Sequence, residues 1–146
     1  MPTPESSDRP ELEGLTLPSR AESLEKFQAF VRSRAQSSQI PPAKIPVLEL
    51  ALEEILVNII SYAHNGKAGL IRVRCGADLA RFIILIEDDG EYFNPLDREE
   101  PDTTAAIENR PVGGLGIYLV KSMVDDIRYC RVGESNVLEM ALSIHS

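Results

Sequence analysis

The sequence predicts an α+β domain, a two-layer α/β sandwich with helices on one face of a mixed, mostly antiparallel sheet. Two segments with apolar side chains at helical spacing come first, and two short apolar strands follow them directly. A third helix and a closing hairpin complete the chain. Helices that gather on one face of adjacent strands are typical of this architecture.

The first elements follow a tail. Residues 1–10 are rich in proline and small polar residues, so we expect them to be disordered and a single domain to span residues 11–146. Residues 12–17 alternate weakly and predict an edge strand. Ser19 is expected to begin the first helix, with Glu22 as its capping-box partner. The apolar positions of that helix follow helical spacing: Leu24, Phe27, Phe30, Val31 and Ala35.

A second and more hydrophobic helix is predicted for residues 43–63, with Asn65-Gly66 as its stop signal. Two strands are expected next, at residues 70–75 and 82–87, joined by a turn at residues 76–78. The later strand is apolar at five consecutive positions, which suits a strand covered on both faces.

The last third of the chain contains a long polar segment. Residues 94–112 show no periodicity, and a loop of this length in a small domain predicts a functional lid. A third helix over residues 113–125 follows three closely spaced glycines. The final hairpin is expected to turn at Gly133-Glu134.

Composition indicates an ordinary soluble domain. The chain has 146 residues, of which 43% are hydrophobic and 26% charged. A formal net charge of −8 disfavours nucleic acid and anionic membrane as partners. No apolar stretch reaches the roughly 18 residues that span a bilayer. The two cysteines indicate a reducing, cytoplasmic location. Cys75 and Cys130 lack metal-site or redox spacing, and both are expected in the core.

One polar strip on the second helix is a candidate site. Glu54, Asn58 and Ser61 fall within a narrow arc, separated from other acidic residues by apolar positions. An amide oxygen such as that of Asn58 suits Mg²⁺, which takes oxygen ligands and keeps several waters. A carboxylate one turn away can act as a general base. The alternative is two solvated polar residues on an exposed helix face.

Asp88-Asp89-Gly90 ends the most hydrophobic strand. An Asp at a strand end can accept a hydrogen bond from an exocyclic amine, while Gly90 lets the backbone approach a flat ring. The alternative is an ordinary turn, because Asp-Gly is a common turn dipeptide.

A glycine loop leads directly into the third helix. Its candidate phosphate-binding residues are Gly113, Gly114, Leu115 and Gly116. Free backbone N–H groups at a helix start form an anion site, and glycine permits close approach. The spacing fits neither a Walker A motif nor a Rossmann fingerprint. The alternative to a phosphate-binding loop is a flexible linker before the helix.

Two other polar residues carry no site prediction. Lys121 is expected in solvent rather than on a phosphate, and His64 suggests no catalytic arrangement.

Together the order and spacing of these motifs resemble the GHKL superfamily of Bergerat-fold ATPases. Within it, the chain is similar to the bacterial anti-sigma factor serine/threonine kinases of partner-switching systems, over residues 12–145. The resemblance implies that Glu54 is the general base, Asn58 the Mg²⁺ ligand, Asp88 the adenine-amine acceptor and Gly90 a neighbour of the ring. The glycine loop would cradle the phosphates of ATP. Tyr92 departs from the family pattern, which has a glycine there, and puts turnover in doubt more than binding.

The resemblance also implies partners. It indicates transfer of the ATP γ-phosphate to a serine or threonine of a STAS-domain anti-anti-sigma protein, sequestration of a sigma factor, and a homodimer. Three alternatives stay open at this point: an ATP-binding regulatory module without kinase activity, a detached histidine-kinase catalytic domain, and a domain that binds no nucleotide.

Overall fold

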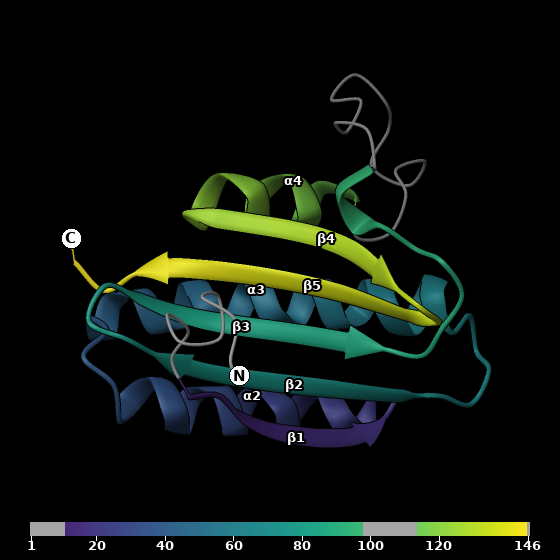
Figure 1. The fold of residues 1–146 in the computed structure, drawn as a ribbon, viewed down its shortest axis with the longest axis horizontal. Coiled ribbons are helices and arrows are strands. Elements are labelled where there is room, and N and C mark those ends of the chain that lie inside the picture. Colours follow the sequence, from purple (N-terminus) through teal and green to yellow (C-terminus); the bar gives the residue numbers. More distant parts are fainter. Residues whose placement is uncertain (1–10, 98–113, 146) are drawn as a thin grey trace, which may run out of the picture.

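The computed structural model describes residues 11–97 and 114–145. The predicted tail, Gly113 and residues 98–112 of the predicted lid lie outside this range. The described strands form one five-stranded sheet in the order β1-β2-β3-β5-β4, and every pairing in it is antiparallel. The helices lie together on one face of this sheet (Figure 1). The predicted two-layer α+β architecture is therefore confirmed.

The N-terminal half supplies two strands and two helices. It contains β1 (Glu13–Pro18), α2 (Glu22–Gln36), a 3-10 turn (Pro42–Lys44), α3 (Ile45–Asn58) and β2 (Leu70–Ala77). One turn of π-helix, Ile59–Ala63, extends α3, and Asn65 and Gly66 then adopt positive φ angles of 51° and 81°. Asn and Gly tolerate that conformation best, which explains why the helix stops where the sequence predicts.

The C-terminal half completes the sheet. It contains β3 (Arg81–Asp88), a 3-10 turn (Pro95–Asp97), α4 (Gly114–Met123), β4 (Asp126–Val132) and β5 (Ser135–Ser143). The β2–β3 turn falls at residues 78–80 rather than 76–78. The reason is that the Asp78 carboxylate accepts hydrogen bonds from the backbone N–H groups of Ala80 (2.7 Å) and Arg81 (2.8 Å).

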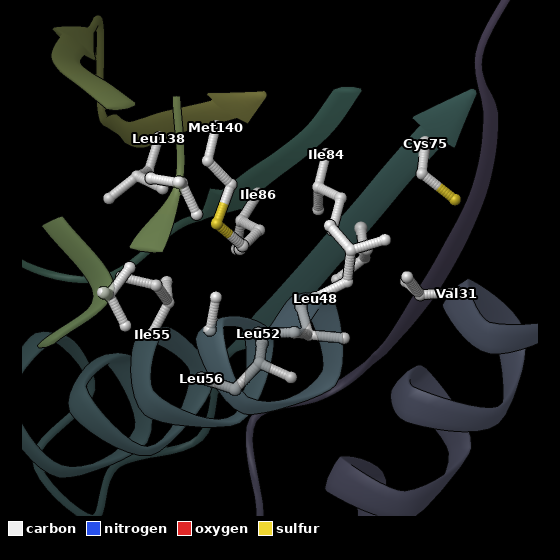
Figure 2. Packing of buried hydrophobic residues seen from close by; sticks show 14 of the residues in the cluster. Val31, Leu48, Leu52, Ile55, Leu56, Cys75, Ile84, Ile86, Leu138 and Met140 are labelled. Atoms are coloured by element: carbon white, nitrogen blue, oxygen red, sulfur yellow. The ribbon is translucent and has the colours of Figure 1, made fainter. Parts of the chain in front are cut away.

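The core lies between the sheet and α2, α3 and α4. Alternate residues of each strand face the helices, so Ile84 and Ile86 meet Leu52 and Ile55 of α3 (Figure 2). Each such side chain contributes about 1.5–3 kcal/mol when fully buried. The predicted double-sided burial of β3 is confirmed: Ile83, on the face away from the helices, is also buried. This packing fixes α3 rigidly and so fixes the direction of its polar strip.

Two expectations about single residues were wrong. The first helix begins at Glu22 with no side-chain cap, because the Ser19 hydroxyl is hydrogen-bonded to His64 instead. Cys75 is buried, and burial raises the pKa of its thiol to about 12. Cys130 is exposed, however, because it lies on the sheet face that points away from the helices.

In the ranges that the structure covers, no helix is long and apolar enough to cross a membrane.

Candidate functional site

Glu54 has an unpaired carboxylate oxygen at the contact between α3 and α4. Its Oε2 atom is buried and has no hydrogen-bond partner among the residues described. A Cβ atom built on Gly116 would lie only 1.9 Å from this oxygen, so the carboxylate rests directly on the α4 backbone. Burial, followed by repulsion from Glu53, raises the pKa of Glu54 above its ordinary value. Such a carboxylate has the basicity and the free lone pairs that a general base needs.

Asn58 lies one turn further along α3 and is fully buried. Its Nδ2 donates to the backbone carbonyl of Glu54 at 2.6 Å, which fixes the amide orientation. Its Oδ1 is buried and receives no hydrogen bond in the described part of the chain. Buried acceptors are nearly always satisfied, so this oxygen calls for a water or an ion. A hard, neutral oxygen donor fits Mg²⁺.

Asp88 ends β3 and is 4% exposed. Its Oδ1 accepts hydrogen bonds from the Gly90 backbone N–H and from Asn136 Nδ2, both at 2.9 Å. Among the described residues, no donor reaches Oδ2, which leaves one acceptor for a ligand amine. Burial raises the pKa of Asp88, and the Asn136 and Gly90 hydrogen bonds oppose that rise because they stabilise the ionised form.

Gly90 allows the end of β3 to touch the end of the helix. A Cβ atom on Gly90 would lie 2.6 Å from the Ala63 carbonyl oxygen, in the last residue of the π turn. The Glu91 N–H donates to this same carbonyl at 3.0 Å. A π turn is uncommon and frequently occurs at functional sites. Here the π turn that extends α3 contacts the residues that follow β3, through Ala63.

A small cavity connects Asp88 with α3. Its volume is about 10 Å³, which is enough for about one water molecule. Phe93 closes one side of it and stacks on Tyr62 with ring centroids 5.4 Å apart. The Tyr62–Phe93 ring pair therefore lies at one wall of the cavity. The lining residues are Ile55, Ile59, Ile86, Asp88, Phe93, Pro95, Tyr129, Asn136 and Leu138.

The glycine loop is described only in part. Gly113 lies outside the described residues, and α4 begins at Gly114. The first turn of α4 packs against the Glu54 carboxylate at Gly116. Phosphate binding by Gly113, Gly114, Leu115 and Gly116 stays a prediction. Lys121, expected in solvent, donates from Nζ to the Leu96 carbonyl at 2.7 Å.

Tyr92 stands apart from the cavity. Its side chain is 64% exposed and meets Tyr129 edge to face, with ring centroids 5.8 Å apart. It is not among the residues that line the cavity beside Asp88. The Tyr92 ring therefore does not occupy the cavity beside Asp88.

Two polar groups of the site escaped the sequence analysis. Asn136 faces Asp88 across the β3–β5 pairing, but its place at the start of a strand gave no functional signal. His64 is buried between Ser19 Oγ, 2.6 Å from its Nδ1, and Asp89 Oδ1, 2.7 Å from its Nε2. These partners lie 45 and 25 residues away in sequence, so only the fold brings them together.

A larger hollow, of about 520 Å³, lies on the sheet face away from the helices. It contains none of the predicted site residues. Its charged side chains are paired with each other, Arg74 with Glu87 and Arg128 with Glu139. The orphaned oxygens of Glu54 and Asn58 therefore identify a better candidate site than this wider hollow does.

Comparison with known proteins agrees with this geometry. Residues 17–142 match the model of the family described as "Histidine kinase-like ATPase domain". Two relatives, both named serine-protein kinase RsbW, come from Bacillus thuringiensis (strain Al Hakam) and Bacillus cereus (strain 03BB102). Each is 27% identical over 118 residues, covering 78% of this chain and 74% of the relative. The serine-protein kinase RsbW of Bacillus mycoides (strain KBAB4) is 30% identical over 90 residues, 56% of this chain and 53% of the relative.

A solved structure shares the fold. The Acinetobacter baumannii histidine kinase AdeS matches 94% of this chain and 70% of its own, with a TM-score of 0.51 and 19% identity. At that identity the likeness shows the fold alone. The family match spans most of the chain and includes Glu54, Asn58, Asp88 and Gly90. The chain belongs to the histidine kinase-like ATPase domain family.

Proposed function

We propose that this protein is an ATP-dependent serine/threonine kinase that phosphorylates a STAS-domain anti-anti-sigma protein. The observation that carries the proposal is the buried, unpaired Oε2 atom of the half-buried Glu54, one helical turn from the unpaired amide oxygen of Asn58. Relatives named serine-protein kinase RsbW support the choice of a protein hydroxyl as acceptor.

The proposed chemistry needs positioning more than covalent catalysis, as is usual for phosphoryl transfer. Glu54 would accept the proton of the attacking hydroxyl, and the α4 N–H groups would face the phosphates. Asp88 would accept a hydrogen bond from the adenine amine through Oδ2. Asn58 Oδ1 would hold Mg²⁺, which neutralises phosphate charge when bound. In the described ranges no three His, Cys, Asp or Glu side chains gather as a metal site, so phosphates and water would supply the other ligands.

The proposed partners follow from the resemblance of the sequence motifs to the partner-switching kinases. The unphosphorylated STAS-domain protein would be the substrate, and a sigma factor would be held when that antagonist is phosphorylated. We propose a homodimer and a cytoplasmic location, as the resemblance implies. These parts rest on the likeness to the partner-switching kinases.

The test is incubation of the purified protein with radiolabelled ATP, Mg²⁺ and a STAS-domain protein from the same organism. The expected result is an acid-stable label on the STAS-domain protein, since phosphoserine and phosphothreonine survive acid and phosphohistidine does not. Glu54→Gln should lose the label and still bind ATP. An unlabelled STAS-domain protein that nevertheless forms an ATP-dependent complex would favour the non-catalytic regulatory module instead.

A further inference from the structure

His64 joins three segments of the chain at the end of the sheet where Asp88 lies. It is buried and directly follows the π turn that extends α3. The ends of β1 and β3 and the start of β2 meet at this end of the sheet (Figure 1). Ser19 Oγ lies 2.6 Å from Nδ1 of the ring, and Asp89 Oδ1 lies 2.7 Å from Nε2. An ionised carboxylate can only accept, so Nε2 is the donor of the second pair.

The backbone around His64 holds both the ring and its carboxylate partner in place. The His64 N–H donates to the Ile59 carbonyl at 3.1 Å, which is the five-residue spacing of a π turn. A Cβ atom on Gly69 would lie 2.1 Å from Nε2, so the ring rests against the backbone there. The next residue, Leu70, donates its N–H to the same Asp89 oxygen at 3.0 Å. Asp89 is therefore held by a side chain at the end of α3 and by the backbone of β2.

Asp89 directly follows Asp88, so its position fixes the backbone from which the Asp88 side chain extends. The Asp89 side chain is 55% exposed, so its hydrogen bonds rather than close packing determine where its carboxylate lies. Burial raises the pKa of Asp89, but the hydrogen bonds from Leu70 and His64 outweigh that rise and hold the pKa below its ordinary value. Both donors therefore bind an ionised carboxylate, the form with the stronger hydrogen bonds.

The end of α3 also holds the chain on the other side of Gly90. The Glu91 N–H donates to the Ala63 carbonyl at 3.0 Å. Ala63 and His64 therefore bind the turn at two points, one before Gly90 and one after it. Because the same helix carries the proposed base and the proposed metal ligand, these contacts set the adenine end of the site against the phosphate end.

We propose that His64 is a positioning residue that sets Asp88 through Asp89 and thereby determines the preference of the site for adenine. The inference rests on the proposed nucleotide binding at Asp88. Adenine presents an amine to the free Oδ2 of Asp88, whereas hypoxanthine in the same pose presents a carbonyl oxygen, which a carboxylate repels. The preference therefore depends on how accurately that carboxylate is held. Asp88 keeps its own bonds to Gly90 and Asn136, so loss of the His64 contact should loosen the carboxylate rather than release it.

Two substitutions of His64 separate its two hydrogen bonds. In His64→Gln the amide nitrogen lies as many bonds from Cβ as Nε2 does, so it can still donate to Asp89. In His64→Asn the shorter amide replaces only Nδ1, so it keeps the Ser19 partner and loses Asp89. Both variants replace a buried ring by a smaller amide, so both should lose stability. Only His64→Asn should also lose the placement of Asp88.

The test measures the affinity of the full chain for ATP and for inosine triphosphate, each with Mg²⁺, by competition against a fluorescent ATP analogue. The wild type should prefer ATP. His64→Asn should bind ATP about tenfold more weakly and inosine triphosphate nearly as well as the wild type, so the preference should fall by about tenfold. The conservative variant His64→Gln should restore most of the preference. The control is Ser19→Ala, which removes the other bond of the ring and should lower the melting temperature without changing the preference.

The outcomes separate the inference from the proposed function. If the wild type binds neither nucleotide, both are overturned. If the wild type binds both nucleotides equally, or if His64→Asn keeps the wild-type preference, the role of His64 is refuted and nucleotide binding stands. An equal loss of preference in His64→Gln and Ser19→Ala would also refute this role, because a purely structural contribution of the ring predicts that result.

A second variant covers the case in which His64→Asn fails to fold by circular dichroism. Asp89→Ala removes the same contact from its more exposed side. It should lose the preference for ATP as His64→Asn does, and a wild-type preference in Asp89→Ala would refute the inference.

Discussion

Gly116→Ala should disable catalysis while leaving the fold nearly as stable as before. The added Cβ would lie 1.9 Å from Glu54 Oε2, so the carboxylate must move by about 1.5 Å to reach ordinary contact distance. Oε2 is the far end of a flexible side chain, which can turn away without moving the backbone. Alanine also favours the helix by up to about 1 kcal/mol over glycine, which offsets part of the crowding. The melting temperature should therefore change by only a few degrees.

The effect on phosphoryl transfer should be much larger. A misplacement of about 1 Å in a reacting group can cost about 100-fold in rate, so the initial rate should fall by at least that factor. The assay is label transfer from ATP to the STAS-domain protein, with ATP affinity and thermal unfolding measured in parallel. Ser122→Ala, at an exposed position of the same helix, is the control. Wild-type activity in Gly116→Ala would refute the assignment of Glu54 as the base held against α4.

Three further predictions concern stability and pH. Burial raises the pKa of Glu54, so the folded protein binds this proton more tightly than the unfolded chain, and stability falls as pH rises through the raised value. Glu54→Gln should therefore melt above the wild type at pH 7, with the gain vanishing below about pH 4; a lower melting temperature at pH 7 would contradict this. Ser19→Ala should leave the buried His64 Nδ1 without its hydrogen-bond partner and cost about 1–3 kcal/mol in denaturant unfolding; an unchanged midpoint would mean that the bond contributes nothing. Gly90→Ala should cost about 1–3 kcal/mol, because its Cβ meets the rigid Ala63 carbonyl at 2.6 Å; wild-type melting would show that this contact relaxes freely.

The helices and strands could be predicted because their signals are local. Phe27, Val31 and Ala35 repeat at helical spacing and are buried, and Asn65-Gly66 ends the helix as expected. The Ser19 capping box failed because a distant partner, His64, competes for the hydroxyl. A sequence window contains no information about such a partner.

The site residues also fall into those with a local sequence signal and those whose position depends on the fold. Glu54 and Asn58 could be found because their spacing along one helix reveals a shared strip. Asn136 could not be found, since its importance comes from the register that sets it opposite Asp88. The stacking of Phe93 on Tyr62 beside the cavity was also beyond prediction, because it depends on how the residues after β3 pack against the end of the second helix.

Thermal unfolding of the wild type and of Asp88→Asn, each with and without excess ATP and Mg²⁺, tests nucleotide binding at Asp88 most directly. Ligand at a hundred times its dissociation constant should stabilise the wild type by about 2.7 kcal/mol, a shift of several degrees. Asp88→Asn should fold and show no shift, because its amide oxygen would accept from the Gly90 N–H and Asn136 Nδ2, which leaves an NH2 donor facing the purine amine. A folded wild type that does not shift, or an Asp88→Asn variant that shifts equally, would contradict nucleotide binding at this residue.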